Sequence, residues 1–255
     1  MAEQLFHQKV AIITGAGQGI GLEIARQLAR QGASVLLNDV EKKLAEEGAK
    51  LIQQEKGICT PFPGDASDLD FIQAMVDKAV SQFGKLNIVI ANAGITLFGN
   101  FLEYTAEDFN QVMKVNLSGS FFLSQIAARQ MIHQGMGGRI LFMSSVTGHQ
   151  AHKNLAAYGM SKAALEMLAK TLVVELSQYR ITVNAIAPGA TMTERTSNDP
   201  DYDKTWSRIT PMGKPASTED IANAALFLVS QHSGHITGQS LVIDGGWTSV
   251  SPSPY

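Results

Sequence analysis

Short apolar runs alternate with longer amphipathic stretches along the chain. The runs are rich in β-branched residues and show little strict alternation of apolar and polar positions, which is typical of parallel strands covered on both faces. They predict strands over Val10–Ile13, Ser34–Leu37, Leu86–Ile90, Arg139–Met143, Ile181–Ile186 and Ser240–Ile243. Residues Gly57–Phe62 form a weaker seventh candidate because of Pro61 and Pro63.

Three of the stretches between the runs begin with a helix start signal. Ser67, Thr105 and Ser217 are each followed three residues later by an aspartate, a spacing that predicts a helix cap. Strands that alternate with helices in this way favour a parallel sheet with helices on both faces. We therefore predict one α/β domain over residues 1–255, with a doubly wound parallel sheet of about seven strands.

The stretch from Gly189 to Pro215 follows neither pattern. It is interrupted by Pro200, Pro211 and Gly213 and shows no strand or helix periodicity. A loop of this length inside a compact domain is more often a lid or a binding element than a simple connection. We predict that residues 190–213 form a mobile loop on the substrate side of the site.

Composition and charge exclude several classes of protein. The 255 residues are 45% hydrophobic and 17% charged, and the net charge of −3 without a lysine or arginine run argues against a nucleic-acid partner. No apolar run approaches the roughly 18 residues of a membrane span, and the start, Met1–Lys9, lacks a signal-peptide pattern. The single Cys59, expected to be a small apolar core residue, fits a reducing compartment, so we predict a cytoplasmic protein.

A glycine-rich turn follows the first predicted strand. The segment Thr14–Gly21 reads TGAGQGIG, which fits the pattern TGxxxGxG but no register of GxGxxG. Glycines let the backbone approach a phosphate, and the N-terminus of the following helix offers free N–H groups. The turn therefore favours a phosphate-binding site, with a glycine-rich turn that binds nothing as the alternative.

A second motif lies at the start of a later helix. Tyr158 and Lys162 are four residues apart, so they lie on one helix face. A nearby ammonium favours the phenolate of a tyrosine and makes it a usable general acid or base. A solvated surface pair is the alternative, but Ser144 and Ser145 end the strand before this helix, at the edge where open α/β sheets bind ligands.

With both motifs in place, the chain resembles the short-chain dehydrogenase/reductase family from about Lys9 to Gly246. The elements occur in the family's order: TGAGQGIG at 14–21, Asp65, ANAG at 91–94, Asn116, Ser145, Tyr158 with Lys162, Pro188-Gly189 and VIDGG at 242–246. One departure is Ala91, where the family usually has asparagine; this position supports a turn. The resemblance implies a Rossmann-like fold and hydride transfer between a nicotinamide cofactor and a small secondary alcohol or carbonyl compound.

The resemblance assigns four catalytic residues. Tyr158 would donate or accept the proton, and Ser145 would hydrogen-bond the substrate oxygen. Lys162 would hold the nicotinamide ribose, and Asn116 would fix a water that relays protons through Lys162. Ser144 is expected to be structural.

The resemblance also assigns contacts to the cofactor. Asp65 and Ala66 would contact the adenine, Asn92 would lie beside the adenosine, and Thr193 would bind the carboxamide. The expected cofactor contacts are Gly15, Gln18, Gly19, Ile20, Gly21, Asp39, Asp65, Ala66, Asn92, Gly94, Tyr158, Lys162, Pro188, Gly189, Thr191 and Thr193.

Asp39 favours NAD(H) over NADP(H). It ends the second predicted strand, where a carboxylate can accept hydrogen bonds from the adenosine ribose and would repel the 2′-phosphate of NADP. Family members that use NADP place an arginine or lysine in the glycine-rich turn or just after the second strand, whereas the position in the turn is Gln18 here. Lys42 and Lys43 are the counter-argument, but they begin a helix and are expected to face solvent.

The substrate is left open by the sequence. The main alternative is reduction of 3-oxoacyl groups on an acyl carrier protein. Family members with that activity tend to have basic residues at two positions where this chain has Met136 and Tyr179, which makes this alternative less favourable. A cofactor-binding regulator without activity is disfavoured because the catalytic residues are present. His149 and His152 lack the further ligands of a metal site, so no metal is expected. Candidate substrate contacts are Thr96, Thr147, His152, Lys153, Asn154 and Trp206.

We expect a homo-oligomer. The helices near residues 105–132 and 155–179 have apolar residues on more than one face, and such a helix needs a second surface to cover it. These residues are Phe109, Val112, Phe121, Phe122, Met167 and Leu168. Family members commonly build a four-helix contact from these two helices, so the resemblance favours a tetramer.

Overall fold

Consecutive apolar residues of the first strand serve two separate cores. Along β1 (Val10–Ile13), Val10 and Ile12 pack into one core, whereas Ala11 and Ile13 pack into the other. All four residues are buried because helices cover both faces of the sheet. The unbroken apolar run therefore follows from the period of two along a strand that has no solvent face.

The computed structural model describes residues 4–251 and contains seven parallel strands in the order β3-β2-β1-β4-β5-β6-β7. The strands after β1 are β2 (Ser34–Leu37), β3 (Ile58–Pro61), β4 (Ile88–Ala91), β5 (Gly138–Met143), β6 (Ile181–Pro188) and β7 (Ser240–Ile243). The direction of winding reverses between β1 and β4. The predicted doubly wound, Rossmann-like parallel sheet is confirmed.

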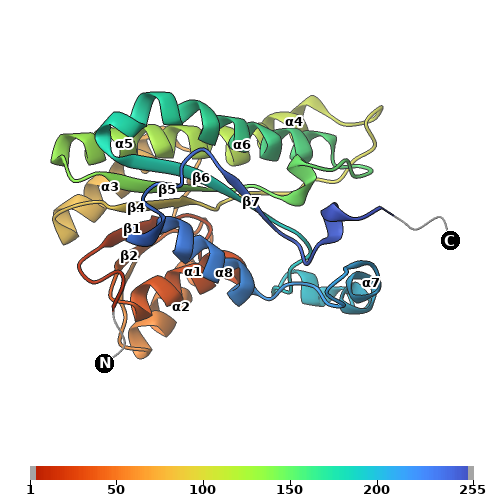
Figure 1. Ribbon diagram of the computed structural model, residues 1–255, viewed down its shortest axis with the longest axis horizontal. Coiled ribbons are helices and arrows are strands. Elements are labelled where there is room, and N and C mark those ends of the chain that lie inside the picture. Colours follow the sequence, from red (N-terminus) through yellow and green to blue (C-terminus); the bar gives the residue numbers. More distant parts are fainter. Residues whose placement is uncertain (1–3, 252–255) are drawn as a thin grey trace.

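Helices form a layer on each face of the sheet (Figure 1). One layer consists of α1 (Gly19–Arg30), α2 (Lys42–Gln54) and α8 (Thr218–Val229), and the other of α3 (Leu69–Phe83), α5 (Ser120–Gln134) and α6 (Ala156–Leu176). The short helix α4 (Ala106–Val112) continues through a π-helical turn, Met113–Gly119, directly into α5. Helix α7 (Tyr202–Ile209) lies beyond the edge of the sheet (Figure 1).

The predicted strand boundaries agree closely with the structure. Gly57–Phe62 was the weakest candidate and forms β3, an edge strand, which is where a sheet tolerates a proline. The strand expected over Leu86–Ile90 begins two residues later, because the Leu86 N–H binds the side chain of Gln134 at 3.1 Å. Strand β6 continues past Ile186 to Pro188, which is the last residue of the strand.

Two of the three predicted helix caps are confirmed. Thr105 caps α4, and Ser217 forms a reciprocal capping box with Asp220 at the start of α8. The prediction for Ser67 is wrong. Asp68 caps α3 by accepting a hydrogen bond from the Phe71 N–H at 2.8 Å, whereas the Ser67 hydroxyl donates to Asp65.

No helix within residues 4–251 is both long and apolar enough to cross a membrane. The predicted domain of residues 1–255 reaches beyond the described part of the chain at both ends, so its limits stay a prediction.

The cap of α3 gives a stability prediction. Asp68→Ala should lower the free energy of unfolding by about 1 kcal/mol, because the Phe71 N–H loses its acceptor. Asp68→Asn should stay near the wild-type value, since asparagine also caps well. Urea unfolding of the three proteins at one concentration measures this. Equal losses in both variants would show that charge, rather than the cap, stabilises this helix start.

Candidate active site

The glycine-rich turn lies between β1 and α1, as predicted. Gly15 and Gly19 have positive φ angles of 59° and 61°, which favour glycine. A Cβ on Gly21 would lie 2.5 Å from the carbonyl oxygen of Gly15, so the turn has no room for a side chain there. The first-turn amides of α1 have no acceptor within the helix and point to an anion-binding position.

Asp39 holds this turn from the next strand. It is buried, and its two carboxylate oxygens accept hydrogen bonds from the N–H groups of Gly17 at 2.9 Å and Glu41 at 3.0 Å. Lys42 and Lys43 are exposed and lie near Glu46 and Glu47, each four residues along α2. Both lysines therefore face solvent, as expected from the sequence.

The Tyr158–Lys162 pair lies on one face of α6. Lys162 is buried, its Nζ donates a hydrogen bond to the carbonyl oxygen of Met143 at 2.7 Å, and Nζ lies 5.4 Å from the centre of the Tyr158 ring. Burial lowers the pKa of the Lys162 ammonium, the neighbouring Tyr158 opposes this change, and the Arg195 guanidinium lowers the pKa further. The pair therefore lies against the carboxyl edge of the sheet and is not a solvated surface pair.

Asn116 reaches this edge from the π-helical turn. It is fully buried and exchanges two hydrogen bonds with the backbone of Ile95, at 2.8 and 3.0 Å, while its amide also donates to the Ser161 hydroxyl. A Cβ on Gly94 would lie 3.2 Å from Lys162 Nζ and 3.4 Å from Asn116 Oδ1. The π turn and the glycine thus bring the amide close to the lysine, in keeping with the frequent use of π turns at functional sites.

The two serines after β5 have different surroundings. Ser145 lines the cavity and precedes the 3₁₀ turn Val146–Gly148, and its Oγ accepts from the Thr147 N–H at 3.3 Å. Ser144 is buried, and its hydroxyl lies 2.6 Å from a carboxylate oxygen of Glu166 and 3.0 Å from the carbonyl oxygen of Lys162. Both serines line the cavity, but Ser144 is held by two hydrogen bonds to α6, as a structural residue would be; the contact of Ser145 with the substrate stays a prediction.

Sequence reasoning missed the role of Glu166. Its carboxylate contacts both Ser144 and the His149 Nε2, the latter at 3.0 Å. Glu166 lies one helical turn after Lys162, so the spacing Tyr158–Lys162–Glu166 at four-residue steps was the available signal. His149 is thus paired with a carboxylate, and no group of three or more metal-ligating side chains occurs within residues 4–251.

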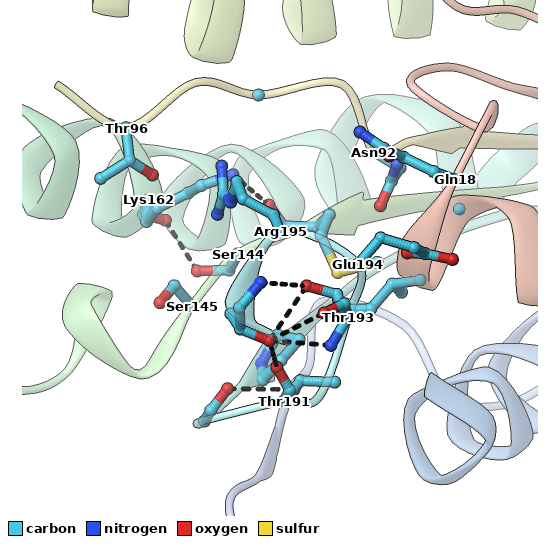
Figure 2. Close-up of a pocket in the computed structure, with 18 of the residues that line it drawn as sticks. Gln18, Asn92, Thr96, Ser144, Ser145, Lys162, Thr191, Thr193, Glu194 and Arg195 are labelled. Carbon is cyan, nitrogen blue, oxygen red and sulfur yellow. Dashed lines mark hydrogen bonds between the residues drawn. The ribbon is translucent and has the colours of Figure 1, made fainter. Parts of the chain in front are cut away.

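The glycine turn, the start of α6 and the segments that follow β5 and β6 surround a cavity of about 270 Å³ at the carboxyl ends of the strands (Figure 2). The predicted site residues that line it are Gln18, Gly19, Ile20, Gly21, Asn92, Gly94, Thr96, Ser145, Tyr158, Lys162, Pro188, Gly189, Thr191 and Thr193. The predicted residues outside its lining are Gly15, Asp39, Asp65, Ala66, Asn116, Thr147, His152, Lys153, Asn154 and Trp206. The lining also contains Ser144, which was expected to be structural, and five residues that sequence reasoning did not assign to the site: Met143, Glu194, Arg195, Thr196 and Tyr202.

Asp65 lies away from this cavity. Its carboxylate accepts hydrogen bonds from the backbone and hydroxyl of Ser67 and lies 3.7 Å from Lys114 Nζ. Burial raises the pKa of the Asp65 carboxyl, but the Ser67 hydrogen bonds and the Lys114 charge outweigh this and leave the pKa below its ordinary value. The lining of the cavity therefore does not test the expected contact of Asp65 and Ala66 with the adenine, and that contact stays a prediction.

The segment 190–213 is more ordered than its sequence indicates. It contains a 3₁₀ turn, Thr196–Asn198, and the helix α7. The Tyr202 hydroxyl accepts a hydrogen bond from the Thr191 N–H at 3.1 Å. Trp206 packs edge-on against Trp247, which in turn stacks on His152, with ring centres 5.1 Å apart in each pair. The prediction of an irregular loop is wrong, because these aromatic contacts come from distant parts of the chain.

Comparisons with known proteins agree with this geometry. A family model described as enoyl-(acyl carrier protein) reductase matches residues 15–248. L-Rhamnose-1-dehydrogenase of Scheffersomyces stipitis is 37% identical over 254 residues, which cover 95% of this chain and 96% of that protein. 2-Dehydro-3-deoxy-D-gluconate 5-dehydrogenase of Dickeya dadantii is 35% identical over 243 residues, which cover 94% of this chain and 95% of that protein.

The solved structures give the same result. A short-chain type dehydrogenase/reductase from Mycobacterium marinum aligns with a TM-score of 0.91 and 33% identity, over 97% of this chain and 99% of that one. Sequence and fold thus match over nearly the whole length of both chains. The chain belongs to the short-chain dehydrogenase/reductase family of oxidoreductases.

Proposed function

We propose that the protein is an NAD(H)-dependent oxidoreductase that moves a hydride between the nicotinamide and a secondary alcohol or carbonyl group of a small molecule. The observation that carries this proposal is the buried Lys162 against the Tyr158 ring, in one cavity with Ser145 and the glycine turn. The relatives named for L-rhamnose and for 2-dehydro-3-deoxy-D-gluconate support a sugar, polyol or related hydroxy compound as substrate.

The residues present fit a nicotinamide dinucleotide. Its pyrophosphate would lie at the N-terminus of α1, where Gly19 and Gly21 line the cavity. Asp39, at the end of the second strand, would receive the adenosine ribose, and Thr191 and Thr193 line the cavity. When bound, the nicotinamide supplies the hydride acceptor or donor.

The side chains at the catalytic end of the cavity have separate tasks. During oxidation the phenolate oxygen of Tyr158 would accept the proton of the substrate hydroxyl, and during reduction the Tyr158 phenol would donate that proton to the substrate oxygen. Ser145 donates a hydrogen bond that holds the substrate oxygen near Tyr158. The Lys162 ammonium stabilises the phenolate form of Tyr158, and Asn116 keeps Ile95 and Ser161 in place around Lys162.

Reduction of 3-oxoacyl groups on an acyl carrier protein is the second candidate, and the matching family model is described by an enzyme that acts on the same carrier, enoyl-(acyl carrier protein) reductase. Such a carrier is acidic, and its docking needs basic residues on the enzyme surface. Met136 and Tyr179 are 57% and 41% exposed at the two positions where basic residues would serve this purpose. The nearby Arg180 guanidinium donates to the Gly135 carbonyl oxygen. A small substrate is therefore the better supported proposal.

The segment 190–213 is proposed to cover the substrate. It joins the cavity wall at Thr191 and Thr193 to the aromatic contact between Trp206 and Trp247. Covering the cavity would exclude water from the reacting atoms.

A cytoplasmic location is part of the proposal. Cys59 is a free, buried cysteine, and burial raises the pKa of its thiol to about 12. A thiol in this state is an inert apolar core residue that a reducing compartment preserves.

Removal of the Tyr158 hydroxyl tests the reaction. Tyr158→Phe should fold and bind NADH as the wild type does, but kcat should fall at least about 100-fold, because no other side chain of the site replaces the proton donor. The measurement is turnover with NAD⁺ on a panel of sugars, polyols, hydroxy acids and cyclic alcohols, with NADH binding as the control. Near-wild-type turnover in this variant would contradict the mechanism.

The choice of cofactor depends on Asp39. We expect the wild type to prefer NAD⁺ over NADP⁺ at least tenfold in kcat/KM, about 1.4 kcal/mol or more, because this carboxylate repels a 2′-phosphate. Asp39→Ser should narrow the preference, mainly through better use of NADP⁺. Asp39→Asn removes the charge but keeps an acceptor for the Gly17 N–H. It therefore shows whether the cofactor preference depends on the charge or on the hydrogen bond that supports the turn. A wild type that prefers NADP⁺ would instead implicate Lys42 or Lys43.

Assembly into a homotetramer is also proposed. Within helices α4 to α6, Val112 is buried, whereas Phe109, Phe121 and Met167 are 38%, 39% and 62% exposed. The predicted second apolar surface of these helices is therefore present, and a partner chain would cover it.

Light scattering tests the assembly. We expect about four times the 27.4 kDa mass of one chain. Met167→Glu should give smaller particles because it places a charge in the apolar contact, whereas Met136→Glu, at an exposed residue outside these helices, should not. A wild type that stays monomeric at micromolar concentration would refute the proposal.

A further inference from the structure

Two adjacent residues of opposite charge face the cavity without pairing. Glu194 and Arg195 both line it, yet neither forms an ion pair within the described residues 4–251. Their side chains diverge: Arg195 lies on the side of Lys162, and Glu194 points toward the turn that carries Gln18 (Figure 2). A Cβ built on Gly19 would lie 3.7 Å from a Glu194 carboxylate oxygen. The two charges therefore act at opposite ends of the cavity.

The catalytic end of the cavity holds two cations and no carboxylate. Lys162, Glu194 and Arg195 are the charged residues of its lining, and Glu194 faces the glycine turn. Burial lowers the pKa of the Lys162 ammonium, and the Arg195 guanidinium lowers it further, so the field of Arg195 reaches the catalytic lysine. Burial raises the pKa of the Tyr202 phenol, and the hydrogen bond from Thr191 and the charge of Arg195 oppose that rise. An anion bound at this end would offset the repulsion between the two cations.

The position of Arg195 distinguishes between two anions that could occupy it. A dinucleotide pyrophosphate would lie at the N-terminus of α1, which is the end that Glu194 faces. Arg195 lies on the side of Lys162 (Figure 2), whose Nζ is 5.4 Å from the centre of the Tyr158 ring, so it lies at the end where the substrate carbon would react. A guanidinium binds a carboxylate through two parallel hydrogen bonds, which gives direction as well as affinity.

We propose that Arg195 is a specificity-determining residue that binds a carboxylate group of the substrate. The preferred substrates are then hydroxy acids and the corresponding oxo acids rather than neutral alcohols. This inference rests on the proposed dehydrogenase function and deepens it, because it names the chemical class of the substrate.

Matched pairs of neutral and acidic compounds test the proposal. The pairs are glycerol with glycerate, erythritol with erythronate, and sorbitol with gluconate, assayed with NAD⁺ on wild type and Arg195→Gln. The acids should be the better substrates of the wild type. Arg195→Gln should lose about 10- to 100-fold in kcat/KM on the acids, mainly through KM, and less than about threefold on neutral compounds. Arg195→Lys should recover part of the loss, because it restores the charge without the paired hydrogen bonds.

Two further variants serve as controls. Arg208→Gln changes another arginine of the same segment, one that does not line the cavity, and should leave both kinds of substrate unaffected. Trp206→Ala disturbs the contact with Trp247 and should change KM for acidic and neutral compounds alike. Only Arg195 variants should separate the two classes.

Binding measurements separate failure of this inference from failure of the proposed function. In the presence of NADH, the acids should raise the Tm of the wild type and of Tyr158→Phe but not of Arg195→Gln. If the acids raise the Tm in this pattern but are not turned over, the dehydrogenase function is contradicted and the carboxylate site is supported. Acids that neither react nor raise the Tm, or equal losses on both classes in Arg195→Gln, would overturn the carboxylate site. Weaker NADH binding by Arg195→Gln with unchanged substrate preference would also overturn it, since Arg195 would then hold the cofactor phosphates.

Discussion

The buried ammonium of Lys162 is the constraint on which the site depends. Taking such a charge out of water costs several kcal/mol unless hydrogen bonds and nearby groups compensate. Here the carbonyl oxygen of Met143, at the end of β5, accepts a hydrogen bond from Nζ, and the ring of Tyr158 lies beside it. The lysine is therefore held at the carboxyl edge of the sheet, and the tyrosine is held with it.

The rest of the fold brings the partners of this lysine to the same edge. Helix α6 approaches from one layer and α1, with its glycine turn, from the other, because the winding reverses between β1 and β4. The absence of a side chain at Gly94 leaves space for the ammonium, and the π turn before α5 brings Asn116 close to it. On the outer wall, Trp206 and Trp247 hold α7 in place.

The charges around the cavity are unevenly distributed. Asp39 lies behind the glycine turn, and its two carboxylate oxygens accept hydrogen bonds from backbone N–H groups. It therefore supports the turn in addition to its proposed contact with the adenosine ribose. Glu194 faces the front of the same turn, and Arg195 adds its charge to that of Lys162 at the other end. In the proposed function, the dinucleotide would lie along the end with the glycine turn, and an anionic substrate would lie at the other end.

The sequence by itself determined the features that depend on local spacing. The apolar runs predicted all seven strands, and the Tyr158–Lys162 spacing placed both side chains on one helix face. Tertiary structure alone decided which neighbours each side chain meets. It paired Glu166 with Ser144 and His149, turned Glu194 and Arg195 apart, and gave the segment 190–213 a helix. Periodicity reports contacts within a few residues, whereas these contacts depend on segments that are distant in the sequence and meet only when the sheet has formed.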